Sequence, residues 1–206
     1  MWPLGRVNIQ LCIINGKNHD LGQKRGIRPD AHWGFPLKVN VAVVYAMIGE
    51  FFRQNKYAAL VWLLLRLYLG ITWLTLGIGK MTGGFNAEGF LRNAVANPVM
   101  REGSMVYPNY VGFLEHVALP YADVINVMIP LGEVLVGLGL IVGVLTCYAA
   151  FFAIVMNMSF LMAGTVSTNP WMIALSFFLL VAGANAGRYG GDRWVLPYIR
   201  HRLSGK

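Results

Sequence analysis

The chain has 206 residues, of which 56% are hydrophobic and only 13% are charged, and its mean hydropathy is +0.53. These values exclude an ordinary soluble domain and are typical of a small helical membrane protein. The net charge of +8 does not indicate nucleic-acid binding, because the basic residues flank apolar stretches and are not interleaved with stacking aromatic residues.

Residues 1–46 differ in character from the rest of the chain. They are polar, rich in glycine, proline, lysine and arginine, and lack the continuous apolar core of a secretory signal peptide. We expect a disordered or loosely packed cytoplasmic tail; the alternative is that translation begins at Met47. Cys12, His19 and His32 fall in this segment, and their spacing matches no metal site.

Residues 47–206 are predicted to form one all-α integral membrane domain, a bundle of four transmembrane helices. A helix needs about 20 predominantly apolar residues to cross a hydrocarbon core of roughly 30 Å. Four stretches meet this requirement approximately, at residues 57–81, 123–145, 147–165 and 170–188.

The connection from 82 to 122 is too long for a simple loop, and its apolar residues recur at helical spacing. We expect two short interfacial helices there, covering one end of the bundle. His116, next to Glu115, is a candidate proton acceptor at that end, although a lone exposed histidine is more often inert.

Lysine and arginine are concentrated before the first span and after the fourth. The positive-inside rule therefore places both termini in the cytoplasm of a multi-pass protein of the cell membrane. Attraction to membrane lipid headgroups is a secondary consequence of the same charge.

Cysteine and histidine usage excludes several redox mechanisms. Cys12 and Cys147 are the only cysteines and form no CxxC pair, so thiol-disulfide relay chemistry is not expected. His116 and His201 lie at or outside the predicted membrane edges, which argues against haem. We predict no metal or haem.

Charged residues inside predicted spans are the strongest functional signal, because a charge at bilayer depth is costly. Counted from the cytoplasmic ends at about 1.5 Å per residue, Arg66 lies roughly 13 Å deep and Glu133 roughly 18 Å deep. Asn157 and Ser176 fall at a similar level. We expect an Arg66–Glu133 pair, either as a structural clasp between helices or as a proton-linked or headgroup-binding site.

Small residues predict close helix packing or dimerisation in two spans. Gly139 and Gly143 form a GxxxG pattern in the second span, and Gly183 and Gly187 form another in the fourth. A homo-oligomer is therefore one expected assembly.

Three segments resemble the DoxX/DoxD membrane proteins: LLLRLYLGITWLTLGIGKMTGG, PLGEVLVGLGLIVGVLT and AGANAGRYGGDRW. The resemblance covers about residues 57–197 and includes Arg66, Gly77 with Lys80, Glu133 and Asp192. It implies a four-helix membrane bundle. For the DoxD members it implies a subunit of thiosulfate:quinone oxidoreductase, which passes electrons from a sulfur substrate to membrane quinone.

The resemblance and the residues together predict a quinone-linked oxidoreductase subunit with a separate redox partner. Arg66 would donate to a quinone carbonyl and Glu133 would exchange protons. The residues expected to bind the cofactor are Arg66, Trp73, Lys80 and Asn157, with Tyr68 and Phe160 as further candidates for the walls of the slot. The alternative is a non-catalytic scaffold or small-solute permease with a structural Arg–Glu clasp.

Overall fold

The computed structural model describes residues 41–203 and 205, so most of the predicted tail lies outside the described residues. The first described element is α1, Val41–Gln54, and the predicted boundary at residue 47 falls inside this helix. The chain then turns at Asn55 into α2, Lys56–Thr82, which coincides with the first predicted span. The Asn55 side chain caps α2 by accepting hydrogen bonds from the backbone N–H groups of Tyr57 and Ala58.

The long connection contains the two short helices that the sequence predicts, and one element that it does not. Helix α3 covers Ala87–Ala96, and a small antiparallel hairpin follows, with β1 at Met100–Arg101 and β2 at Ser104–Met105. Glu102 and Gly103 form its turn, both with positive φ. The second helix is not isolated, because α4 continues without a break into the next long helix.

That continuous segment consists of α4 (Pro108–Phe113), a π-helical turn η1 (Leu114–Ala118), a 3₁₀ turn η2 (Leu119–Tyr121) and α5 (Ala122–Val142). The chain continues through α6 (Thr146–Met162), α7 (Asn169–Ala182), the 3₁₀ turn η3 (Gly183–Asn185) and α8 (Asp192–Leu203). The second and fourth predicted spans extend too far, because α5 ends at Gly143 and α7 at Gly183, both of which adopt positive φ.

Within the described residues, two helical segments are long and apolar enough to cross a membrane, Lys56–Thr82 and Pro108–Val142. The third and fourth predicted spans correspond to shorter apolar helices, Thr146–Met162 and Asn169–Asn185. A helix of 17 residues is about 25 Å long, near the lower limit for crossing the hydrocarbon core.

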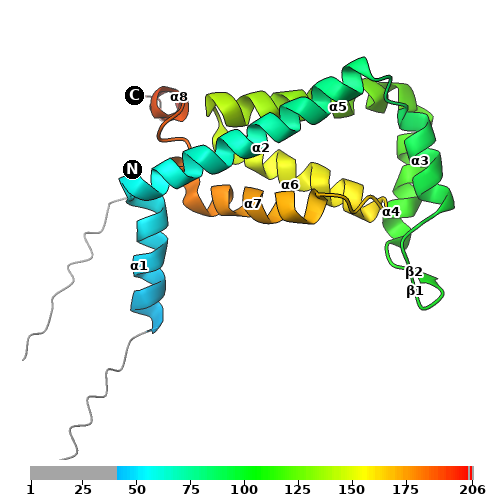
Figure 1. The fold of residues 1–206 in the computed structure, drawn as a ribbon, viewed down its shortest axis with the longest axis horizontal. Helices are drawn as coiled ribbons and strands as arrows, with labels where there is room; N and C mark the ends of the chain where they lie inside the picture. The colour runs from blue at the N-terminus through cyan, green and yellow to red at the C-terminus, as the bar shows by residue number, and fades with distance from the viewer. Residues whose placement is uncertain (1–40, 204, 206) are drawn as a thin grey trace, which may run out of the picture. The chain divides into compact units, whose positions relative to one another are not determined.

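The helices pack as two antiparallel pairs, α2 with α5 and α6 with α7 (Figure 1). The pairs are joined by contacts of α5 with α6 and of α2 with α7. Figure 1 shows α3, α4 and the hairpin at one end of this bundle, and α1 and α8 at the other. Many large apolar side chains face outward from the helices, among them Leu64, Ile71, Leu135, Phe151 and Phe177, as expected of surfaces in contact with lipid.

Glycines set the register between α2 and α5, but they are not those of the predicted GxxxG patterns. A Cβ atom on Gly137 would lie 2.6 Å from the backbone nitrogen of Leu74, and one on Gly70 would lie 3.0 Å from the carbonyl oxygen of Gly137. A Cβ atom on Gly77 would lie 2.8 Å from the backbone nitrogen of Val134. The two backbones are therefore in direct contact, which side chains would prevent.

Candidate functional site

A buried ion pair joins the last turn of α2 to the middle of α5. Lys80 Nζ lies 2.6 Å from Glu133 Oε1 and 2.8 Å from Oε2, so the ammonium group contacts both carboxylate oxygens. The Glu133 side chain is only 1% exposed, whereas that of Lys80 is 26% exposed. The carboxylate is thus held in the protein interior, and the lysine connects it to the surface.

This pair lies in a cavity of about 300 Å³ between the helices and the end of the bundle that carries α3. Lys80 Nζ is 5.4 Å from the centroid of the Phe160 ring and 5.8 Å from that of Phe85, within the range of cation–π attraction. Phe90 of α3 packs edge-on against Phe160, and Trp73 also lines the cavity. Aromatic side chains therefore form one part of the wall around the ion pair.

Two buried donors beside the ion pair have no hydrogen-bond partner among the described residues. They are the amide Nδ2 of Asn157 and the indole Nε1 of Trp73, and both residues line the cavity. Asn157 is 1% exposed, so it gains no compensation from bulk solvent. A buried donor without a partner costs about 1–3 kcal/mol, so a water molecule or a ligand that accepts these hydrogen bonds would stabilise the site.

The connection between α6 and α7 closes the cavity with polar side chains. Thr165, Ser167, Thr168 and Asn169 line it, and the Asn169 amide donates to the carbonyl oxygen of Thr165 at 2.7 Å. The first three of these residues are exposed on their other side. This end of the cavity is therefore polar and borders the solvent-exposed surface.

Lys80 and Phe85 also line two outer hollows, one between α2 and α5 and one along α2. One of them includes Met81 and Val127, and the other includes Leu76, all of which are exposed apolar residues. The lysine and the phenylalanine thus separate the inner cavity from an apolar outer surface.

The predicted Arg66–Glu133 pair is not formed, and this is the main correction to the site. Arg66 is fully buried, but its guanidinium donates to the carbonyl oxygens of Ala186 at 3.2 Å and Tyr189 at 3.4 Å. The glycine contacts that align α2 with α5 place Gly77 beside Glu133 and place Arg66 beside Gly143, where α5 ends. Lys80 therefore takes the position expected for the arginine.

Arg66 belongs to a separate polar cluster near α8. Here Asp192 accepts hydrogen bonds from the backbone N–H groups of Leu145 at 2.6 Å and Thr146 at 3.0 Å, and so caps the first turn of α6. A Cβ atom on Gly143 or Gly190 would collide with the Arg66 guanidinium, which explains why glycine stands at both positions. This cluster connects the segment before α8 to the first half of α2, the end of α5 and the start of α6.

Five residues predicted for the site do meet in the cavity: Trp73, Lys80, Glu133, Asn157 and Phe160. Arg66 does not line it, Tyr68 is exposed on the outer face of α2, and the buried hydroxyl of Ser176 is not among the lining groups. His116 is exposed, with Nδ1 2.9 Å from the carbonyl oxygen of Gly112, and also lies outside it. Sequence reasoning missed Phe85 and Phe90 because aromatic residues in a connecting segment carry no sign of what they face.

Comparison with known proteins gives one result. The family model described as DoxX matches residues 61–168, which include most of α2 and all of α3 to α6. No curated protein and no solved structure matches the chain significantly. The matched range contains Lys80, Glu133 and Asn157, and it covers about half of the sequence. The chain therefore belongs to the DoxX family of membrane proteins.

Proposed function

We propose that this protein is the membrane subunit of a quinone-linked oxidoreductase, with the quinone ring held in the cavity of Lys80 and Glu133. The proposal rests mainly on the buried ion pair, which shares its cavity with four aromatic side chains and with the unpartnered amide of Asn157. Pockets for small molecules typically combine apolar walls with a few converging polar groups in this manner.

The donors in the cavity fit a quinone because its two carbonyl oxygens only accept hydrogen bonds. Lys80 Nζ has three protons, and both of its contacts to Glu133 leave a donor for a carbonyl oxygen. The Asn157 Nδ2 group is a second donor without a partner among the described residues. The aromatic side chains of Phe85, Phe90 and Phe160 offer flat surfaces for the ring.

The volume of about 300 Å³ suits a ring rather than a complete isoprenoid quinone. The tail would leave past Lys80 and Phe85 into the outer hollows, where Leu76, Met81 and Val127 continue as an apolar surface. Such a path keeps the tail in the lipid while the head reaches the ion pair.

When bound, the quinone supplies two-electron, two-proton redox chemistry. Glu133 would hold and release a proton close to the ring, because protonation of its carboxylate offsets charge that develops there. Lys80 would polarise a carbonyl oxygen. The exposed polar residues Thr165, Ser167 and Thr168 would allow proton exchange with water.

In this proposal the electrons come from a partner redox subunit, because the sequence carries no recognisable motif for a centre that stores electrons. The DoxD-like role in thiosulfate oxidation is the most specific version of this proposal. The charge of Lys80 is already balanced by Glu133, so the anionic sulfur substrate would react on the partner and only the quinone would enter the cavity.

In the proposed topology, α2, α5, α6 and α7 all cross the cell membrane and both termini are cytoplasmic. The basic residues near α1 and α8 support this orientation. The cavity would then open toward the outer face, where the loop of Thr165–Asn169 lies.

The test is mass spectrometry of the lipids that co-purify with the full-length protein and with its Glu133→Gln variant. We expect a stoichiometric quinone with the parent protein and at least tenfold less with the variant. Glu88→Gln is the matched control, because Glu88 forms an exposed ion pair with Arg92 on α3, outside the cavity. No quinone with the folded parent protein, or equal loss in both variants, would refute the proposal.

A further inference from the structure

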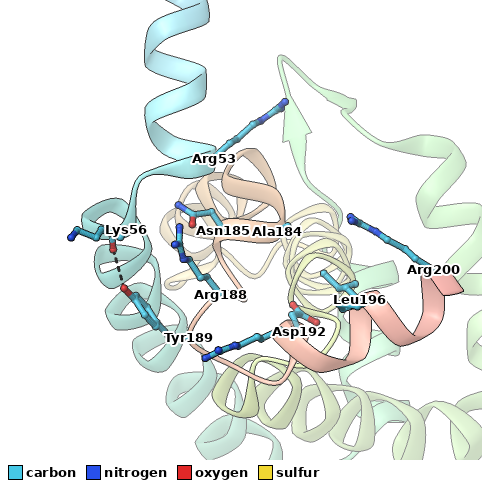
Figure 2. Close-up of a pocket in the computed structure, with 11 residues that line it drawn as sticks. Arg53, Lys56, Ala184, Asn185, Arg188, Tyr189, Asp192, Leu196 and Arg200 are labelled. Atoms are coloured by element: carbon cyan, nitrogen blue, oxygen red, sulfur yellow. Dashed lines mark hydrogen bonds between the residues drawn. The ribbon is translucent and has the colours of Figure 1, made fainter. Parts of the chain in front are cut away.

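A second cavity, of about 630 Å³, lies at the other end of the bundle, where α1, the start of α2 and α8 meet (Figure 2). Its basic lining residues come from four segments: Arg53 from α1, Lys56 from α2, Arg188 from the connection before α8, and Arg193 and Arg200 from α8. In Figure 2 Arg53 lies at the top of the view with its guanidinium directed upward, and Arg200 lies at the right. We call this cavity the basic pocket.

The positive charge of the basic pocket is not balanced within the described part of the chain. Asp192 is its only acidic lining residue, and both carboxylate oxygens of Asp192 are already bonded to backbone N–H groups of α6. None of the five cations forms an ion pair with a described carboxylate. The cavity lining therefore carries an excess of positive charge, which an anionic ligand would offset.

Two of these cations are fixed in place by the backbone. Arg53 Nε donates to the carbonyl oxygen of Val181 at 3.2 Å, and one terminal nitrogen of Arg188 donates to that of Gln54 at 2.9 Å. Each guanidinium keeps further N–H groups for a ligand. The site is therefore partly ordered before any anion arrives.

The surroundings of the basic pocket favour a lipid over a free anion. On α8, Trp194 is 69% exposed and Tyr198 is 62% exposed, and both alternate with arginines, a pattern typical of helices at the membrane interface. Leu196 and Pro197 add apolar lining beside the charges. A small free anion would need neither the aromatic residues nor the apolar lining.

We infer that the basic pocket binds the headgroup of an anionic phospholipid that carries two phosphates. Five cations against one carboxylate leave the lining strongly positive, and a headgroup with two phosphates offsets more of this charge than a single phosphate does. Basic pockets between helices at the cytoplasmic side of membrane proteins are suited to headgroups of this kind. The inference does not depend on quinone binding, because the two cavities share no lining residue.

The test is native mass spectrometry of the full-length protein in detergent. The protein is titrated with diphosphatidylglycerol or with phosphatidylglycerol, and the second lipid is used at twice the concentration so that both titrations contain the same amount of phosphate. The variant is Lys56→Gln with Arg200→Gln, two exposed side chains that donate no described hydrogen bond. The matched control is Arg92→Gln with Arg101→Gln, which removes the same charge at the other end of the bundle. Circular dichroism establishes that both double variants remain helical.

We expect the parent protein and the control to prefer the two-phosphate lipid, and the Lys56/Arg200 variant to bind it about 10-fold to 30-fold more weakly. Equal weakening in both double variants, or no preference over phosphatidylglycerol, would show general electrostatic attraction and overturn the inference. Inorganic phosphate or thiosulfate, added at the same concentration as the lipid phosphate, should not displace the lipid. Displacement would show that the pocket binds free anions and would also overturn the inference.

Discussion

Lys80 and Glu133 form an ion pair that also connects two helices, because its 2.6 Å contact joins the end of α2 to the middle of α5. A purely structural ion pair and an ion pair that binds quinone would make the same contact. The two roles differ in what is expected when the two residues are exchanged. Lys80→Glu alone leaves two carboxylates together in the interior and should cost about 3–5 kcal/mol in unfolding free energy.

The exchange Lys80→Glu with Glu133→Lys should recover most of that stability, since opposite charges again meet. It should not restore quinone binding, because the donor and the proton-exchanging group are then reversed relative to Asn157. Unfolding of the single and double variants in detergent, together with their quinone content, checks this prediction. Full recovery of both properties would identify the pair as a structural clasp that takes no direct part in quinone binding.

Arg66 should act on stability and leave the cavity unchanged. Arg66→Gln removes the donors to the carbonyl oxygens of Ala186 and Tyr189, in a site with no access to solvent. We expect a loss of about 2–4 kcal/mol in unfolding free energy. In protein that remains folded at low temperature, quinone content should match that of the parent.

The control for Arg66 is Arg92→Gln, which removes an exposed arginine from an i,i+4 ion pair and should change stability by less than about 0.5 kcal/mol. Loss of quinone in folded Arg66→Gln protein would contradict the assignment of Arg66 to the α8 cluster.

Two glycines of α2 provide a matched test of helix packing. A Cβ atom on Gly77 would meet the backbone of Val134 at 2.8 Å, whereas one on Gly79 would meet nothing within 4 Å. Gly77→Ala should therefore destabilise the protein by about 1–3 kcal/mol through overpacking. Gly79→Ala should stabilise it by up to about 1 kcal/mol, because alanine favours the helix. Thermal unfolding of the two variants measures the difference, and equal shifts would contradict the α2–α5 register.

The same register explains what could be predicted from the sequence and what could not. Apolar stretches located α2, α5, α6 and α7 closely, because the length and composition of a helix are properties of its own residues. Depth along each span also placed Glu133 and Asn157 at a similar level, and both line the same cavity. It failed for Arg66, since counting from predicted ends assumes that all helices start at one level.

The true alignment depends on contacts between distant glycines, which no local pattern reveals. The close contacts at Gly70, Gly77 and Gly137 fix the position of α2 along α5. In this position Lys80 contacts Glu133, and Arg66 lies beside the residue at which α5 ends. Gly143, from the predicted GxxxG pattern, does not contact another helix in this way. Its missing side chain leaves room for the Arg66 guanidinium. A predicted pairing of side chains between two helices can therefore be wrong even where the bounds of both helices are predicted well.

Asn157 gives the sharpest separation between a binding role and a packing role. Its amide Nδ2 is buried without a partner among the described residues, so the wild-type side chain lowers stability unless a ligand accepts from it. Asn157→Leu should leave the ligand-free protein equally stable or more stable by about 1 kcal/mol, because an apolar side chain of similar shape carries no unmet donor. The same change should reduce the co-purifying quinone at least tenfold.

Ser176→Ala is the matched control, because the Ser176 hydroxyl is also buried and unpartnered in the described structure but does not line the cavity. It should preserve the quinone while producing a similar or smaller change in stability. Unfolding curves recorded after quinone extraction, with the quinone content before extraction, test both expectations together. If Asn157→Leu retains the quinone as well as Ser176→Ala does, Asn157 makes no contact with it, and the donor for the second carbonyl must be sought elsewhere in the cavity.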